Sequence, residues 1–157
     1  MPAHELKSSI EIDATPRHVW TILTDFARYP EWNPFIPFIR GRPEPGNRLQ
    51  VRIQPSGTKG MNFRPVVVAA DKERELRWLG RLIVPGIFDG EHRFTIRALS
   101  DRTVLFEQSE TFTGLLVPIF LRNLDRDTKR GFEEMNRALK NRAEAASLAD
   151  NMMKATG

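Results

Sequence analysis

Three polar side chains that could move protons fall within two short segments of the chain. His92 belongs to the segment GEHRFTI, and Gln108 and Glu110 belong to EQSETFTGLL. A histidine and a carboxylic acid that share an apolar site can act as general base and general acid, because apolar surroundings favour the protonated form of a carboxyl group. His92 can instead bond to Gln108 or Glu110 and only stiffen the structure, and Glu110 can lie at a rim in water. His92 and Glu110 are therefore candidate catalytic residues, with both interpretations open.

The other chemistries that leave a recognisable spacing are missing from the sequence. The chain has no cysteine, which excludes disulfides, thiolate metal ligands and cysteine nucleophiles. Its histidines, His4, His18 and His92, do not have the spacing of a zinc-binding motif, and no G-x-S-x-G elbow, P-loop or dinucleotide-binding fingerprint occurs. We therefore expect no metal and no cofactor, and binding is favoured over catalysis.

The composition predicts a single water-soluble domain over residues 1–157. Hydrophobic residues make up 40% and charged residues 28%, and the N-terminal segment MPAHELKSSIEI lacks the apolar core of a signal peptide. No apolar run is long enough to span a membrane. The net charge of +4 is scattered along the chain, which is typical of a solvated surface. We expect a cytoplasmic protein with no nucleic-acid partner and no stable membrane insertion, and the oligomeric state stays open.

Alternating and helical periodicities predict the elements that must position these side chains. Residues 5–14 alternate as a half-buried strand, and Thr15 and Pro16 are typical of a helix N-cap and a first helical position. Prolines prevent any long helix through residues 30–45. Further alternation predicts strands joined by short turns at residues 48–54, 61–70, 75–83, 87–97 and 103–112.

The periodicity becomes helical after Gly114. An apolar stripe runs along one side of residues 117–152, a length sufficient to cross the whole sheet. Gly131 lies within the stripe and is expected to face the sheet, since an exposed glycine within a helix costs about 1 kcal/mol with no gain in packing. The prediction is an α+β protein in which a curved antiparallel sheet of about six strands wraps around a long C-terminal helix, with one or two short helices after the first strand.

Pairing the later strands through their turns predicts which residues share the inner face of the sheet. Gly80 and Gly90 become neighbours there and leave a gap, beside which His92, Gln108 and Glu110 face inward among aromatic side chains. The expected pairs are Val67 with Trp78, Trp78 with His92, Gly80 with Gly90, Leu82 with Phe88, Phe94 with Phe106, His92 with Gln108, and Gly90 with Glu110. Buried polar groups need partners, so this face predicts a hydrogen-bonded cluster or a cavity that holds a ligand.

The segment DFARYPEWNPF, residues 25–35, is rich in aromatic residues and interrupted by prolines. It has two interpretations. Tyr29, Trp32, Asn33 and Phe35 wall the mouth of a cavity, or Trp32 and Phe35 plug the open end of the sheet. The cavity wall is favoured, because aromatic walls are usual in apolar ligand sites.

Several blocks of the sequence resemble one known superfamily, and they occur in its order. These blocks are ATPRHVWTILTDFARYPEWNPFI, FRPVVVAADKERELRWLGRL, GEHRFTI, EQSETFTGLL and GFEEMNRALKNRAE, and the resemblance extends over residues 6–144. The chain is similar to the SRPBCC, or START-like helix-grip, superfamily, and within it to the bacterial polyketide cyclase/dehydrase-like branch. The resemblance implies a deep cavity between the sheet and the long helix, with the short helices and the strand turns at its entrance.

The implied cavity and the inward-facing residues together predict a set of ligand-binding side chains. This set comprises Tyr29, Trp32, Asn33, Phe35, Phe63, Trp78, Gly80, Phe88, Gly90, His92, Phe94, Phe106, Gln108, Glu110, Phe112 and Met135. The leading hypothesis is binding or transport of a small hydrophobic molecule, lipid- or polyketide-like. The alternative is a cyclase/dehydratase-type enzyme that uses the polar residues of the cavity. A quinone-binding or ribosome-associated interaction module, implied by the DFARYPE block, is less favoured because the following Trp-Asn-Pro fits the cyclase-like branch better.

Overall fold

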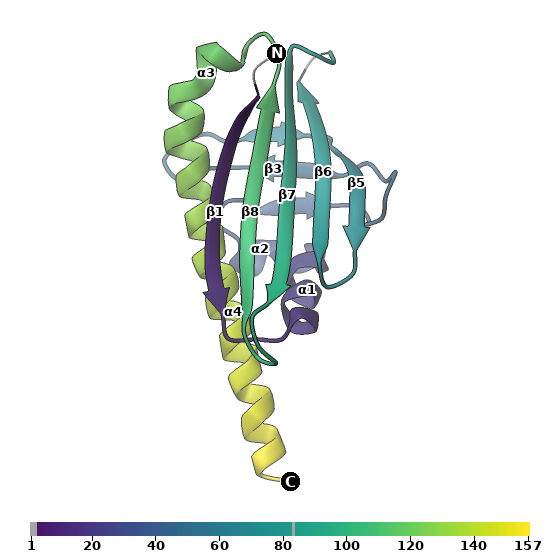
Figure 1. Ribbon diagram of the computed structural model, residues 1–157, viewed down its shortest axis with the longest axis vertical. Helices are drawn as coiled ribbons and strands as arrows, with labels where there is room; N and C mark the ends of the chain where they lie inside the picture. The colour runs from purple at the N-terminus through teal and green to yellow at the C-terminus, as the bar shows by residue number, and fades with distance from the viewer. Residues whose placement is uncertain (1–2, 83) are drawn as a thin grey trace.

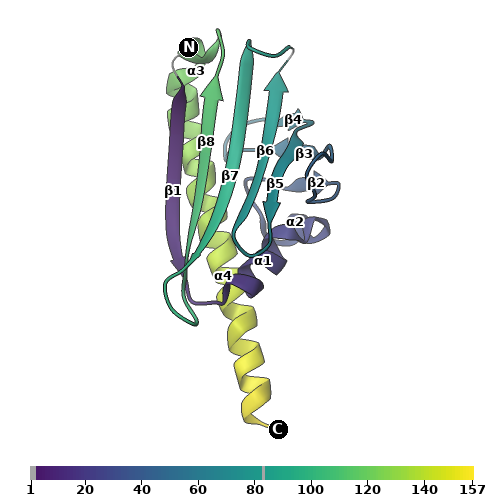
Figure 2. The ribbon, with the colours of Figure 1, turned by 45° about the vertical axis from the view of Figure 1, so that its right-hand side comes forward.

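The computed structural model describes residues 3–82 and 84–157. In that part of the chain, a curved antiparallel sheet of five strands packs against a long C-terminal helix, and a three-stranded sheet lies on the same side as the helix (Figure 1, Figure 2). The elements in chain order are β1 (His4–Ile12), α1 (Pro16–Thr24), a 3-10 turn (Phe26–Arg28), α2 (Tyr29–Trp32), β2 (Phe38–Arg40), β3 (Gln50–Ile53), β4 (Met61–Phe63), β5 (Val66–Asp71), β6 (Glu75–Leu82), β7 (Phe88–Ala98), β8 (Val104–Thr113), α3 (Val117–Asn123), a π-helical turn (Leu124–Thr128) and α4 (Lys129–Ala155).

The strand order is β1-β8-β7-β6-β5 in the large sheet and β2-β3-β4 in the small one. The predicted α+β helix-grip fold is therefore confirmed, but its strands are divided between two sheets. The strand expected over residues 61–70 is broken at Arg64 and Pro65, because proline has no N–H to donate to a strand ladder. β2 has only three residues, too few for an alternation that would predict it.

The start of α1 has the cap that the sequence indicates. The Thr15 side chain accepts a hydrogen bond from the backbone N–H of His18 at 3.2 Å, and Pro16 is the first helical residue. This arrangement satisfies one of the N–H groups that a helix start leaves without a partner. Leu23 is fully buried on the inner side of the helix, which fixes α1 against the rest of the fold.

The C-terminal helical segment begins at Val117, as predicted, and continues to Ala155. A π-helical turn over Leu124–Thr128 separates α3 from α4, which the sequence pattern did not indicate. π turns are rare and occur frequently at functional sites. The last turns of α4 project past the end of the sheet (Figure 1).

The register of the large sheet places the expected residues on its inner face. The predicted pairs across β5, β6 and β7 are confirmed, namely Val67 with Trp78, Trp78 with His92, Gly80 with Gly90, and Leu82 with Phe88. The predicted pairing of β7 with β8 is wrong by two residues, since the structure pairs Gly90 with Phe112, His92 with Glu110, Phe94 with Gln108, and Ile96 with Phe106. The same side chains still face inward, because a shift of two residues preserves the alternation of a strand.

Gly131 is buried in α4, as expected, but its neighbour is not the sheet. A Cβ atom at this position would overlap the ring of Phe35, which belongs to the connection between α2 and β2. Phe35 is fully buried and packs edge-on against Phe132, with 5.6 Å between the ring centroids. The glycine therefore lets a loop aromatic ring approach the helix backbone closely.

We expect Gly131→Ala to lower the free energy of unfolding by about 1–3 kcal/mol, because the enclosed Phe35 ring must move to admit the methyl group. The higher helix propensity of alanine, about 1 kcal/mol, opposes this loss without cancelling it. Urea denaturation of the variant measures the change. In a Phe35→Leu background the same substitution should cost less, and a stabilised Gly131→Ala protein would contradict the close approach.

Candidate functional site

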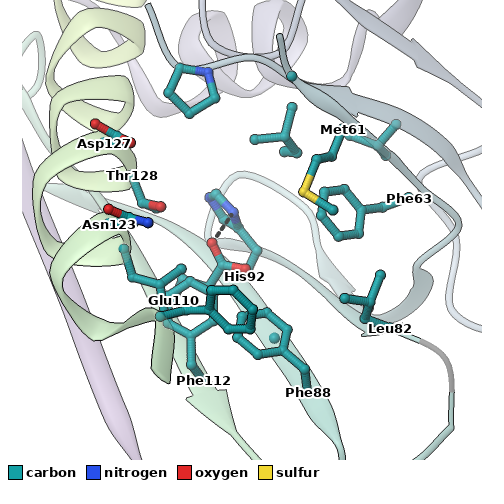
Figure 3. A pocket seen from close by; sticks show the side chains of 18 of the residues that line it. Met61, Phe63, Leu82, Phe88, His92, Glu110, Phe112, Asn123, Asp127 and Thr128 are labelled. Atoms are coloured by element: carbon teal, nitrogen blue, oxygen red, sulfur yellow. Dashed lines mark ion pairs between the residues drawn. The ribbon is translucent and has the colours of Figure 1, made fainter. Parts of the chain in front are cut away.

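A cavity of about 440 Å³ lies between the inner face of the large sheet, the small sheet and the start of the C-terminal helical segment (Figure 3). The large sheet contributes Trp78, Gly80, Leu82, Phe88, Gly90, His92, Glu110 and Phe112. The small sheet and the loops next to it contribute Val51, Ile53, Pro55, Thr58, Lys59, Gly60, Met61, Phe63 and Pro65. The helical side contributes Phe120, Asn123, Leu124, Asp127 and Thr128. Most of this wall is apolar, and its polar groups are few.

Two of the polar groups form a pair on the sheet side of the cavity. His92 Nδ1 lies 3.4 Å from Glu110 Oε2, across the β7–β8 pairing that sets the two residues opposite each other. The His92 side chain is 1% exposed and that of Glu110 is 17% exposed. Glu110 therefore presents the pair to the cavity, with the His92 ring beside it (Figure 3). The sequence predicted that the two residues would share the inner face, and the structure brings them into contact.

The other side of the His92 ring is joined to a buried chain of amides. His92 Nε2 lies 3.1 Å from Gln108 Oε1, and Gln108 Nε2 donates to Asn136 Oδ1 at 2.6 Å. Asn136 Nδ2 in turn donates to the Ser8 hydroxyl oxygen at 3.1 Å. The chain crosses from β7 through β8 to α4 and back to β1, so it ties the helix to the sheet beneath the cavity.

The backbone of α4 fixes the direction of this chain. Gln108 Nε2 also lies 3.4 Å from the carbonyl oxygen of Phe132, which can only accept a hydrogen bond. Turning the amide over would set two acceptor oxygens against each other in a buried place. This contact favours the orientation in which Gln108 Oε1 faces His92 and the Nε2 nitrogen of His92 is the donor.

The direction of the chain constrains the protons between His92 and Glu110. Without a proton between them, the Nδ1 lone pair would face a carboxylate. With two protons between them, His92 would be an imidazolium facing a neutral carboxylic acid, and burying this unpaired positive charge is costly. One shared proton gives a pair that is neutral overall, either imidazolium with carboxylate or neutral imidazole with carboxylic acid. Such a pair can hold or pass on a proton at the cavity wall.

The two inner-face glycines have different surroundings. A Cβ atom on Gly90 would lie 2.7 Å from Glu110 Oε1, so the glycine makes room for the Glu110 carboxyl group beside β7. A Cβ atom on Gly80 would have no neighbour closer than 3.8 Å, so this position opens onto the cavity. Gly90 therefore leaves room for the Glu110 carboxyl group, whereas Gly80 leaves open space in the cavity.

The π-helical turn contributes a charged group that is already neutralised. Asp127 receives hydrogen bonds from Arg126 Nε at 2.9 Å and from Arg130 Nη2 at 3.4 Å. The hydrogen bond from Arg126 holds the pKa of the Asp127 carboxyl below its usual range. Asp127 is therefore ionised at neutral pH, but its two arginine partners compensate its charge at the cavity wall.

Some predicted site residues lie behind the wall instead of on it. The structure brings together Phe63, Trp78, Gly80, Phe88, Gly90, His92, Glu110 and Phe112 around the cavity. Phe94, Phe106, Gln108 and Met135 are fully buried in the layer beneath and do not line it. The His92 ring stacks on Phe94, with 4.3 Å between ring centroids, so this layer supports the polar pair from below.

The aromatic segment does not wall this cavity, which corrects the favoured interpretation. Tyr29 is fully buried, donates from its hydroxyl group to the Leu23 carbonyl oxygen at 2.5 Å, and packs against Trp32 with 5.0 Å between ring centroids. Burial raises the pKa of the Tyr29 hydroxyl group, and the nearby charge of Asp25 raises it further. The hydroxyl group therefore stays a donor. Asn33 Oδ1 accepts from two backbone N–H groups of the following turn. Tyr29, Asn33 and Phe35 are therefore core residues, which is closer to the second interpretation.

Trp32 faces a different hollow of the surface. This second depression lies between the first helices and α4, and its wall includes Trp32, Asp25, Arg28 and Arg142. The expected single pocket that joins Trp32 to the inner face of the sheet is therefore wrong. Phe35, whose ring fills the space at Gly131, is likewise part of the core.

Sequence reasoning missed the helical side of the cavity and much of the small sheet. Leu124, Asp127 and Thr128 belong to the π-helical turn, and Asn123 is the last residue of α3 before it. Leu124 and Thr128 stand in the apolar stripe of the predicted helix, which was the available signal for their inward position. Val51 and Ile53 lie in the strand predicted over residues 48–54, but only the structure shows which inner surface they cover.

Neither a bilayer-spanning helix nor a metal-binding cluster occurs in the described part of the chain. None of its helices is both long enough and apolar enough to cross a membrane. Residues 3–82 and 84–157 also contain no group of three or more His, Asp or Glu side chains that could hold a metal ion.

The arrangement of a curved sheet around a long helix is found in solved structures of other proteins. An aromatase/cyclase from Streptomyces sp. R1128 superimposes with a TM-score of 0.74 at 13% identity, over 91% of this chain and 94% of that one. A START superfamily protein from Mycobacterium smegmatis superimposes with a TM-score of 0.71 at 22% identity, over 91% of this chain and 99% of that one. Norcoclaurine synthase from Thalictrum flavum superimposes with a TM-score of 0.71 at 11% identity, over 93% of this chain and 97% of that one. These similarities define a START-like, or SRPBCC, fold.

The family follows from the sequence as well. The profile of the family described as polyketide cyclase / dehydrase and lipid transport matches residues 3–144, which is most of the chain. The chain therefore belongs to this family, and the resemblance noted from its sequence blocks is confirmed. No curated protein matches the chain.

Proposed function

We propose that the protein binds a small hydrophobic molecule in the cavity between the large sheet, the small sheet and the π-helical turn. The observation that carries the proposal is the cavity itself, whose volume of about 440 Å³ is within the usual range for small-molecule sites. Its wall is built mainly of aliphatic and aromatic side chains, with a few convergent polar groups. Such a wall removes apolar ligand surface from water, which is the main source of affinity for this kind of ligand.

Family membership supports the same proposal at a coarser level. The family description takes in polyketide cyclases, dehydrases and lipid transport, and a cavity with a mainly apolar wall suits a lipid- or polyketide-like molecule. The direct test is native mass spectrometry of freshly purified protein. We expect a fraction of the protein to retain a small molecule that organic extraction releases. Uniformly empty protein that also fails to bind neutral apolar probes such as naphthalene or diphenylhexatriene would contradict the proposal.

A second candidate function is an enzyme of the cyclase/dehydratase type. One observation favours it: His92 and Glu110 lie in contact at the cavity wall, with Nδ1 and Oε2 3.4 Å apart. A group of this kind can add a proton to a bound substrate and take one away. For any polyketide-like substrate that is converted, His92→Ala and Glu110→Gln should abolish turnover while leaving substrate binding measurable. Unchanged turnover in both variants would exclude this role.

A further inference from the structure

We propose that the cavity selects an uncharged, mainly apolar ligand that carries a hydrogen-bond donor, such as a hydroxyl group, at the end nearest Glu110. This inference rests on the proposed function and specifies the ligand class of the same site. It follows from the hydrogen-bonding capacity that the buried chain leaves at the cavity wall. The atom that would accept this hydrogen bond is Glu110 Oε1.

The buried chain determines what Glu110 can offer to a ligand. Because the Phe132 carbonyl oxygen fixes the Gln108 amide, His92 Nε2 donates to Gln108, and one proton is shared between His92 Nδ1 and Glu110 Oε2. This proton is engaged between the two side chains in either of its positions. Glu110 Oε1 is then an acceptor in both cases, as a carboxylate oxygen or as the carbonyl oxygen of an acid.

Glu110 Oε1 has no protein partner among residues 3–82 and 84–157. It lies over Gly90, 2.7 Å from the place where a side chain would begin, and Glu110 itself reaches into the cavity (Figure 3). The residues around it are largely apolar, including Phe88 and Phe112. An acceptor in such surroundings gains most from a ligand that supplies a donor, and loses most from a ligand that blocks it with an apolar group.

The charges near Glu110 and the π-helical turn favour an uncharged ligand there, and the other charged residue of the wall, Lys59, is exposed on the small-sheet side. One shared proton would leave the His92–Glu110 pair neutral overall, and Asp127 is compensated by Arg126 and Arg130. A charged ligand would lose its hydration without an uncompensated charge to pair with at the sheet side of the cavity. The matched ligand therefore combines an apolar body with a hydroxyl or similar donor.

The test compares three probes of similar shape, 2-naphthol, 2-methoxynaphthalene and naphthalene. Their dissociation constants are measured from backbone amide shifts in NMR titrations of the full chain. 2-Naphthol offers a donor, its methyl ether keeps the oxygen but loses the donor, and naphthalene has neither. We expect the wild-type protein to bind 2-naphthol about tenfold or more tightly than the ether, as one hydrogen bond to a carboxyl acceptor predicts.

Two substitutions at one position separate the acceptor from the side-chain volume. Glu110→Leu removes the acceptor, so the preference for 2-naphthol should disappear while naphthalene still binds. Glu110→Gln can place its N–H against His92 Nδ1 and keep its oxygen toward the cavity, so most of the preference should remain. Glu107→Leu is the matched control on the outer face of β8, where Glu107 pairs with Lys7, and it should leave the preference unchanged.

The outcomes distinguish this inference from the function on which it rests. If the wild-type protein binds all three probes with equal affinity, the donor preference is wrong, but the apolar site stands. If Glu110→Leu keeps the preference, the donor is recognised elsewhere and the assignment to Glu110 Oε1 is wrong. If none of the probes binds, the proposed function fails and the inference fails with it.

Discussion

Gly80→Leu should weaken the binding of a neutral apolar dye such as diphenylhexatriene by about 10- to 100-fold while the protein stays folded. Gly80 lies in β6 on the cavity wall, and a side chain there would meet nothing closer than 3.8 Å at its first atom. The leucine would therefore occupy space that the ligand needs, and overpacking of this kind costs roughly 1–3 kcal/mol. Dye fluorescence measures the affinity, and circular dichroism with thermal unfolding measures the fold.

Two other variants show whether the cavity is responsible. Thr95→Leu adds the same side chain to the outer face of the neighbouring strand β7 and should leave dye binding unchanged. Gly90→Ala should keep dye binding but displace the Glu110 carboxyl, because the new methyl group would lie 2.7 Å from Oε1. Full dye affinity in Gly80→Leu would place the ligand site elsewhere on the protein.

The inner face of the large sheet could be predicted from the sequence because strand alternation tolerates errors of pairing. Trp78, His92 and Glu110 face inward whether β8 pairs in the expected register or two residues away. The contact between His92 and Glu110 could not be predicted in the same way. It depends on the loop after β7, which closes through the hydrogen bond from the Leu99 N–H to the Thr103 carbonyl oxygen at 2.8 Å and so sets the register.

The role of the aromatic segment could not be predicted from its composition. Aromatic side chains serve equally well in a core and in a cavity wall, and no periodicity separates the two uses. The deciding contacts are distant in sequence, above all the approach of the Phe35 ring to Gly131 in α4. The glycine was recognised as a position of close approach, but its partner depends on how the loop between α2 and β2 folds over the helix.

The residues on the helical side of the cavity could not be predicted for a different reason. A 3.6-residue pattern continues through Leu124 and Thr128, and a π turn leaves no clear signal in one sequence. The turn brings Asp127 and Thr128 to the cavity, next to Asn123 at the end of α3. The polar residues on this side therefore depend on a local backbone irregularity that hydrophobic periodicity does not report.

Gln108→Leu should lower the free energy of unfolding by roughly 2–6 kcal/mol, the largest stability effect that we expect from a single substitution. Gln108 is fully buried at the middle of the chain, between His92 and Asn136. Its removal leaves the Nε2–H group of His92 without an acceptor and Asn136 Oδ1 without a donor, and each unsatisfied buried group costs about 1–3 kcal/mol. Urea denaturation with a common slope for both proteins measures the loss.

Asn136→Ala removes only the outer link of the same chain and provides the comparison. It leaves Gln108 Nε2 bonded to the Phe132 carbonyl oxygen at 3.4 Å, and His92 keeps its partner. Its cost should therefore be smaller, about 1–3 kcal/mol. The nitrogen shifts of the His92 ring should report a protonated Nε2 in the wild-type protein and in Asn136→Ala, and a changed state in Gln108→Leu. A stable Gln108→Leu protein with an unchanged His92 ring would show that Gln108 does not fix the ring, and the single shared proton on the His92–Glu110 pair would lose its structural basis.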